Sequence, residues 1–299
     1  MNKAKKKLIV ILGPTASGKT KLAVALAKKF DGEIISADSR QVYQGMDIGS
    51  GKDLNEYGNI PYHLIDVASP KKQFSLAKYQ KQANKAIDDC FKRGRQPFLV
   101  GGSGLYLNAI IYGFVLSKSK PNLMLRKSLN QKTLAELQQL ILKNKICLND
   151  SDFRNKRRLI RKLEIFEQPQ AKNTFERNPH YNCLILGVKP DTAEELLNNI
   201  TKRLDFRLQK QGLVEEVENL KKSGLSWKKL EDFGLEYRFI SQYLQGIILI
   251  TEAREKIIVA SRQFAKRQMT WFKKERNLIW LNKPLINDAV KKIKTFLSL

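Results

Sequence analysis

The sequence contains few cysteines, histidines and acidic residues for its length. Its 299 residues include three cysteines and two histidines, and 29 acidic residues stand against 55 lysines and arginines. Cys90, Cys147 and Cys183 lie far apart and show no metal-binding or C-x-x-C spacing, which is typical of reduced thiols in a cytosolic protein and implies no structural zinc. His63 is a lone histidine in its segment, and such a residue is more often a hydrogen-bonded structural group than a catalyst or ligand.

Long apolar runs are also missing from the sequence. The lysines near the N-terminus precede an apolar run of five residues, Leu8–Leu12, which ends at Gly-Pro. This run is too short for the core of a signal peptide, and no other segment is long enough to span a bilayer. We therefore expect a cytoplasmic protein without a membrane partner.

The charge balance is strongly positive. The formal net charge is +26. A generally lysine-rich, solvated surface would also raise this figure, but an excess of this size favours a polyanionic partner, and nucleic acid before a membrane.

The segment Gly13–Thr20 reads Gly-Pro-Thr-Ala-Ser-Gly-Lys-Thr and matches the phosphate-binding pattern G-x-x-x-x-G-K-[ST]. An apolar strand pattern precedes it and a helical pattern, about residues 20–30, follows. In this context the backbone N–H groups of the loop and the helix N-terminus bind an anion. Lys19 is predicted to reach the outer phosphate, and the Thr20 hydroxyl is placed to bind Mg²⁺. The loop alone does not identify the molecule that carries the phosphate.

Two further strand patterns end in polar or glycine-rich segments. Residues 33–36 lead to Asp38, and residues 97–100 lead to the glycine-rich turn Gly101–Tyr106, which contains Ser103. Because the carboxyl ends of parallel strands meet at one edge of a sheet, both segments are expected beside the phosphate loop. Asp38 is a candidate to bind a magnesium ion or to accept a proton in the reaction. The alternative is an aspartate that only caps a helix or stabilises a loop. The pattern predicts an α/β fold, a P-loop NTPase-like parallel sheet flanked by helices.

The composition changes at about residue 117. Residues 118–178 are helical and basic, and we interpret them as a helical insertion into a core formed by residues 1–117 and 179–299. Asp150 or Ser151 is expected to cap a helix whose apolar face includes Phe166. Its basic face, like that of the helix at about residues 251–274, is either a solvated surface or a nucleic-acid contact.

Several blocks, in this order, resemble those of the tRNA dimethylallyltransferases, also called tRNA isopentenyltransferases. They are Gly13–Thr20, Asp38-Ser-Arg-Gln41 with Tyr43, Asp47-Ile-Gly49, His63-Leu-Ile-Asp66, Gly101–Tyr106, Arg158-Leu-Ile-Arg161, Tyr237-Arg238 and Ala265-Lys-Arg-Gln-Met-Thr-Trp271. The phosphate loop is shared by many kinases and NTPases, but the combination is specific, and it extends from Leu8 to about Leu281.

The resemblance implies transfer of a dimethylallyl group from its diphosphate to the exocyclic amine of the adenosine 3′ of the anticodon in tRNA. The phosphate loop would then hold the prenyl diphosphate together with Mg²⁺ and Arg267, with no ATP consumed. The loop residues implied to bind the diphosphate are Gly13, Pro14, Thr15, Ala16, Ser17, Gly18, Lys19 and Thr20. Asp38 would accept the proton of the amine, and Ser103 would hydrogen-bond the diphosphate beside Lys19 and Thr20.

The resemblance also implies a set of residues in contact with tRNA. They are Asp38, Ser39, Arg40, Gln41, Arg157, Arg158, Arg161, Tyr237, Arg238, Lys266, Arg267, Gln268, Trp271 and Lys273. We expect the enzyme to act as a monomer.

The chain departs from the family pattern at several positions. Ser103 stands where threonine is usual, and it keeps the hydroxyl. Ser50-Gly51 replaces a more common Thr-Ala before Lys52, Tyr62 replaces a frequent histidine, and Glu236 replaces the glycine before Tyr-Arg.

Three alternatives remain at this point. A prenyltransferase acting on free AMP or ADP would not need the basic insertion and final helices. A P-loop small-molecule kinase would use the loop for ATP. A non-catalytic RNA-binding protein is disfavoured because Lys19, Asp38 and Ser103 are all present.

Overall fold

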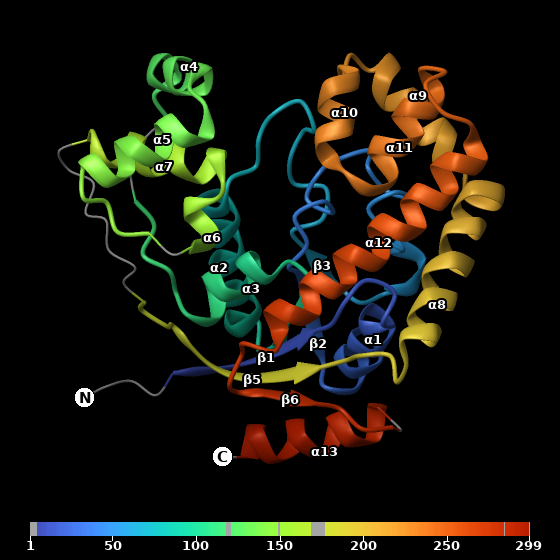
Figure 1. The fold of residues 1–299 in the computed structure, drawn as a ribbon. Helices are drawn as coiled ribbons and strands as arrows, with labels where there is room; N and C mark the ends of the chain where they lie inside the picture. The colour runs from blue at the N-terminus through green and yellow to red at the C-terminus, as the bar shows by residue number, and fades with distance from the viewer. Residues whose placement is uncertain (1–4, 118–120, 149, 169–176, 284, 299) are drawn as a thin grey trace. The chain divides into compact units, whose positions relative to one another are not determined.

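The computed structural model describes residues 5–117, 121–148, 150–168, 177–283 and 285–298. The chain divides into two compact units (Figure 1): Met1–Gly113 together with Pro179–Leu299, and Phe114–Asn178. Residues 118–120, where the insertion was expected to begin, lie outside the described residues.

The first unit is built on a six-stranded parallel sheet with the strand order β3-β2-β4-β1-β5-β6. This confirms the expected α/β fold. β3 is only two residues long, because Leu64 and Asp66 have positive φ values of 65° and 58° and leave the extended region. The strands are β1 (Lys6–Leu12), β2 (Gly32–Ser36), β3 (Tyr62–His63), β4 (Gln96–Gly101), β5 (Tyr181–Gly187) and β6 (Leu278–Trp280).

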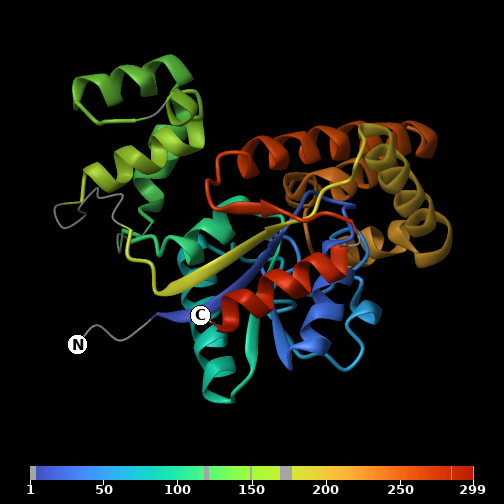
Figure 2. The same cartoon turned by 90° about the horizontal axis from the view of Figure 1, so that it is seen from below.

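Side chains of the central strand alternate between two buried layers. Leu8, Val10 and Leu12 of β1 face one core, and Ile9 and Ile11 face the other. Helices α1 and α13 pack in the second of these cores (Figure 2), and residues of α2, α3, α9, α10, α11 and α12 fill the first. Both faces of the sheet are therefore covered, as in other parallel sheets.

Some helices of the first unit begin and end at residue types that typically cap helices. Ser75 caps α2 through its side chain, and Gly94, with φ 72°, follows the end of the helix. A short π-helix, Arg207–Gln211, separates α8 from α9. The helices are α1 (Lys19–Lys29), α2 (Leu76–Lys92), α3 (Gly104–Ile111), α8 (Ala193–Phe206), α9 (Leu213–Lys222), α10 (Trp227–Phe233), α11 (Leu235–Leu244), α12 (Ile250–Phe272) and α13 (Leu285–Ser298), with a 3₁₀ turn at Leu54–Glu56.

In its described residues, the second unit contains four helices around a small apolar core of its own. They are α4 (Leu123–Gln131), α5 (Leu134–Lys143), α6 (Asp150–Phe153) and α7 (Lys156–Phe166). The expectation of one helix starting at Asp150 or Ser151 was wrong, because Asn155 ends α6 and caps α7 by accepting the Arg158 N–H. Phe166 is also not in the core, since 51% of it is exposed.

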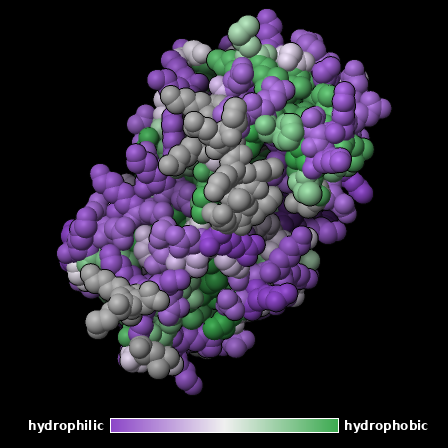
Figure 3. All heavy atoms as spheres, turned by 90° about the vertical axis from the view of Figure 1, so that its left-hand side faces the viewer, coloured by the Kyte–Doolittle hydropathy of each residue, from purple (hydrophilic) through white to green (hydrophobic). Residues whose placement is uncertain are grey.

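No helix in the described part of the chain is long and apolar enough to cross a membrane. Hydrophilic residues dominate the face drawn in Figure 3, and hydrophobic residues show only in patches.

Candidate active site

The phosphate loop leaves the carboxyl end of β1 and leads directly into α1. Ala16 and Gly18 adopt left-handed conformations, with φ of 59° and 78°, and these turns allow the helix to begin at Lys19. Lys19 Nζ donates to the carbonyl of Pro14 at 3.2 Å. The sequence Gly13–Thr20 thus forms the predicted strand-loop-helix arrangement, with the helix N-terminus at the loop.

The Lys19 side chain is half-buried, and other charged groups surround its ammonium. Burial lowers its pKa to about 8, and the nearby Asp38 carboxylate opposes this effect. Arg203, on α8, contributes in the same direction as burial because it carries a like charge. A polyanion bound at this point would offset both the cost of desolvating the Lys19 charge and its repulsion from Arg203.

Asp38 and Ser103 follow the neighbouring strands β2 and β4, and both lie beside the loop. The Ser103 backbone N–H donates to the Ala37 carbonyl at 3.1 Å, and the Ser39 N–H donates to Ser103 Oγ at 3.0 Å. Asp38 Oδ1 accepts the Arg40 N–H at 2.8 Å. One carboxylate oxygen is therefore oriented by its own turn. Both residues lie at the carboxyl ends of their strands, where the sheet-edge argument placed them.

These groups line one cavity of about 490 Å³ within the first unit. Most of the predicted site residues meet there: Thr15, Lys19, Thr20, Asp38, Ser39, Arg40, Gln41, Ser103, Tyr237, Arg238, Arg267 and Gln268. Three predicted residues at α12 do not line the cavity: Lys266 and Trp271 lie on the helix, and Lys273 directly follows it. Three others belong to the second unit, namely Arg157, Arg158 and Arg161.

Ser17 is a predicted diphosphate-binding residue that the structure does not bring to the cavity wall. Its hydroxyl oxygen is buried and has no hydrogen-bond partner among the described residues. A Cβ added to Gly13 would come within 2.7 Å of Ser17 Oγ, so the side chain lies against the first residue of the loop. Because this side chain points into the loop, the predicted contact of Ser17 with the diphosphate would be made by its backbone N–H. Gly13, Pro14, Ala16 and Gly18 are likewise absent from the cavity lining.

Two residues that the resemblance places against tRNA are engaged within the protein. Gln268 is buried; its Oε1 accepts the Thr15 N–H and its Nε2 donates to the Gly102 carbonyl, both at 2.9 Å. This side chain ties the phosphate loop to the second glycine turn. Trp271 packs over Gly104, where an added Cβ would collide with the indole ring. These two side chains hold α12 against the site.

Two arginines in the cavity wall were missed by the sequence reasoning. Arg203 and Arg207 are four residues apart, at the end of α8 and the start of the π-helix, and both line the cavity. Arg203 donates from Nη2 to Thr15 Oγ1, and burial together with Arg207 lowers its pKa to about 10. The i, i+4 spacing was the available signal, because it places both guanidinium groups on one helix face.

Two departures from the family pattern meet at Arg207, whose side chain is only 2% exposed. Its Nη1 donates to Glu236 Oε1 at 3.4 Å, and its Nη2 lies 3.6 Å from Asp53 Oδ1. A Cβ on Gly51 would come within 2.5 Å of Nη2, so the absence of a side chain at Gly51 makes room for the guanidinium. Glu236 supplies the countercharge.

The cavity offers oxygen ligands for Mg²⁺ without forming a complete protein cage. Thr20 and Asp38 both line it, and the only cluster of three His, Cys, Asp or Glu ligands found among the described residues lies elsewhere. Mg²⁺ is usually held by one or two protein oxygens, with phosphates and water completing its shell. The donor set therefore fits an ion shared with a bound diphosphate.

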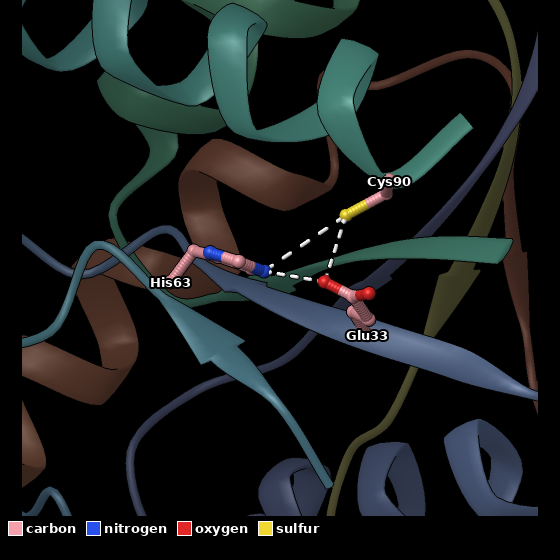
Figure 4. Close-up of side chains that lie close together, drawn as sticks. All are labelled: Glu33, His63 and Cys90. Carbon is pink, nitrogen blue, oxygen red and sulfur yellow. Dashed lines mark hydrogen bonds and ion pairs between the residues drawn. The ribbon is translucent and has the colours of Figure 1, made fainter. Parts of the chain in front are cut away.

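That other cluster joins Glu33 of β2, His63 of β3 and Cys90 of α2 (Figure 4). His63 Nε2 lies 2.6 Å from Glu33 Oε2, and Arg93 donates to both oxygens of the same carboxylate, at 3.1 and 2.6 Å. Burial alone would raise the pKa of Glu33, but these bonds outweigh it and lower the pKa to about 2. Burial and Glu33 raise the pKa of Cys90 to about 12, so it remains a thiol. Because a guanidinium already occupies the carboxylate, we interpret the cluster as an ion-pair network, which agrees with a structural role for His63.

Comparison with known proteins adds independent findings. The family described as IPP transferase matches residues 41–275, and the one described as isopentenyl transferase matches residues 6–59. The chain is 44% identical to tRNA dimethylallyltransferase 1 of Syntrophus aciditrophicus (92% of this chain, 93% of the relative) and 44% identical to tRNA dimethylallyltransferase 2 of Treponema denticola (92% and 94%). The crystal structure of a tRNA isopentenylpyrophosphate transferase from Bacillus halodurans superposes with a TM-score of 0.72 at 33% identity, covering 98% of this chain and 99% of that one.

Proposed function

Because this chain belongs to the IPP transferase family, whose members include the tRNA dimethylallyltransferases, we propose that its cavity transfers a dimethylallyl group from dimethylallyl diphosphate to tRNA. The acceptor is the exocyclic N6 amine of the adenosine immediately 3′ of the anticodon. The observation that carries this proposal is the convergence of Lys19, Asp38 and Ser103 on one cavity whose wall also contains the half-buried Arg203 and the buried Arg207.

The donor diphosphate binds at the phosphate loop. The backbone of residues 13–20, that of Ser17 included, and the start of α1 receive its oxygens, and Lys19 and Arg203 offset its charge. Ser103 reaches the same anion from the second glycine turn, and Arg267 from α12. When Mg²⁺ is bound, Thr20 is its protein ligand, and the ion shares the charge that builds up on the leaving group.

The acceptor amine attacks C1 of the dimethylallyl group as the bond from C1 to the diphosphate oxygen breaks. Diphosphate leaves with the electron pair of that bond, and the amine proton passes to the Asp38 carboxylate. An aromatic amine is a weak nucleophile, so the reaction depends on a well-placed base and a stabilised leaving group. Lys19 serves the second need, because its ammonium group lies at the phosphate loop, where the leaving diphosphate is bound.

The tRNA contacts begin at the cavity and extend beyond it. Gln41, Tyr237 and Arg238 line the cavity where the target base would enter, after leaving its stack. We place further phosphate contacts on the basic side chains outside the cavity, namely Arg157, Arg158 and Arg161 on α7, Lys266 on α12 and Lys273 directly after α12. The chain is proposed to act as a monomer, with a cavity whose lining residues all come from the first unit.

The role of Asp38 can be tested by Asp38→Asn, which removes the base and keeps the shape. The single-turnover rate of transfer should fall by about a hundredfold to ten-thousandfold, while the Kd for tRNA changes less than about twofold. Asp88→Asn, at an exposed carboxylate that pairs with Lys6, is the control and should leave both values unchanged. Equal losses in rate and tRNA affinity for Asp38→Asn would contradict the assignment of a base.

A further inference from the structure

The carboxylate of Glu216, on α9, binds three consecutive backbone amides of the loop Asp47–Asp53. Oε2 accepts the N–H groups of Asp47 and Ile48, each at 2.6 Å, and Oε1 accepts that of Gly49 at 3.0 Å. Successive amides that converge on one anion form a nest, and hydrogen bonds to an ionised acceptor are stronger than those between neutral groups. Glu216 thus fixes the conformation of this loop from outside it.

The same carboxylate also holds α11. Oε1 accepts the hydroxyl of Tyr237 at 2.9 Å, and Tyr237 is 2% exposed. Burial, with the nearby Glu216 charge, raises the pKa of Tyr237 well above its usual value, which keeps the hydroxyl a donor. The Tyr237 ring lies against Gly49, where an added Cβ would come within 2.7 Å of Cζ. Glu216 therefore locks the loop and the tyrosine together.

Both locked parts form the wall of the catalytic cavity, although Glu216 itself does not line it. The loop continues to Gly51, whose carbonyl accepts Gln41 Nε2 at 2.8 Å, and Gln41 Oε1 accepts the Ser36 hydroxyl at 2.8 Å. This chain of bonds fixes the orientation of the Gln41 amide. Gln41 and Tyr237 are cavity-lining residues that we assign to the acceptor, and both depend on the loop that Glu216 holds.

We propose that Glu216 is a positioning residue that sets the acceptor side of the cavity and leaves the donor side unaffected. The inference rests on the proposed function of the cavity. The donor side is built separately, because the phosphate loop is held by Gln268 and Arg203 through Thr15. Loss of the Glu216 carboxylate should therefore separate the two substrates kinetically.

The test compares Glu216→Gln with Glu215→Gln, the same substitution at the neighbouring exposed residue of α9. Glutamine has one acceptor oxygen, and its NH₂ group would face backbone N–H donors. We expect the KM for tRNA to rise about tenfold or more in Glu216→Gln, while the KM for dimethylallyl diphosphate changes less than about twofold. The amide hydrogens of residues 47–49 should exchange faster with solvent. Glu215→Gln should match the wild type in all three measurements.

Two variants distinguish positioning from a general loss of folding. Glu216→Asp keeps the charge on a shorter side chain and should recover part of the tRNA KM. Tyr237→Phe removes one donor and keeps the ring, so its effect should be smaller than that of Glu216→Gln. Equal changes in both KM values, or a Glu216→Gln enzyme that behaves like Glu215→Gln, would overturn the proposal. A wild-type protein inactive on tRNA would instead overturn the proposed function, a result obtained before any substitution is made.

Discussion

The buried pair of Arg207 and Glu236 yields a quantitative prediction about the cavity wall. Arg207 is 2% exposed and Glu236 7%, and their closest N–O distance is 3.4 Å. Within the described protein atoms, Nε and Nη2 of Arg207 have no hydrogen-bond partner. Removing one member of a buried pair typically costs about 3–5 kcal/mol, because the other charge is left uncompensated, whereas replacing both by apolar groups is often neutral.

The perturbation is therefore a double-mutant cycle of Arg207→Met and Glu236→Met. Because the pair is long and Asp53 lies 3.6 Å from Nη2, the loss for Glu236→Met should fall at the lower end, about 3 kcal/mol. Arg207→Met should cost about the same, since it buries the Glu236 carboxylate alone. The double variant should unfold within about 1 kcal/mol of the wild type, which implies a coupling energy well above 2 kcal/mol.

Urea unfolding followed by circular dichroism measures these free energies, and an unchanged m-value would show that the unfolded state is comparable. The reasoning would be refuted if each single variant lost less than about 1 kcal/mol. Additive losses in the double variant would refute it equally, because the two charges would then not compensate each other.

Three further predictions concern other contacts. The pKa of Glu33 is lowered from 4.5 to about 2, so its ionised carboxylate stabilises the fold above pH 4.5, and this contribution is lost as the pH falls toward 2. Arg93→Gln should therefore reduce the dependence of the unfolding free energy on pH between pH 4.5 and 2. Gly104→Ala should destabilise the protein by about 1–3 kcal/mol in thermal unfolding, since the new methyl group overlaps the Trp271 ring, and Trp271→Leu in the same chain should restore part of the loss. Arg203→Met should raise the KM for dimethylallyl diphosphate about tenfold to a hundredfold, because a charge-assisted contact with the diphosphate is lost. An equal rise in the KM for tRNA would contradict the assignment of Arg203 to the donor side.

Much of the fold and part of the site could be predicted from the sequence, because the signals are local. The phosphate loop needs only its neighbouring strand and helix, and the positions of Asp38 and Ser103 follow from the rule that parallel strands end at one edge. The structure brings these residues to one cavity, as that rule requires.

The remaining features depend on contacts between distant segments or on how a side chain is turned. Arg203 and Arg207 carry no motif, and their place in the cavity follows from where α8 ends and the π-helix begins. In the sequence Glu236 is only a departure from a family glycine, whereas the structure shows that its carboxylate is the countercharge of Arg207. The loop motif also does not say that the Ser17 hydroxyl turns toward Gly13, away from the cavity.

The break before α7 has a local cause that the helical pattern concealed. The break is caused by Asn155, whose side chain accepts a backbone hydrogen bond and thereby competes with the helix. The apolar spacing continues across this position, so periodicity alone could not reveal two helices in place of one.

The central claim is that the phosphate loop grips a prenyl diphosphate used to modify tRNA, not ATP. It is tested most directly by incubating the purified protein with Mg²⁺, labelled dimethylallyl diphosphate and unmodified tRNA without ATP, followed by mass analysis of the tRNA nucleosides. We predict that label enters one adenosine of tRNA, that free AMP remains unlabelled in a parallel reaction, and that added ATP is not consumed. Label in AMP but not in tRNA, or a transfer that requires ATP, would contradict the account.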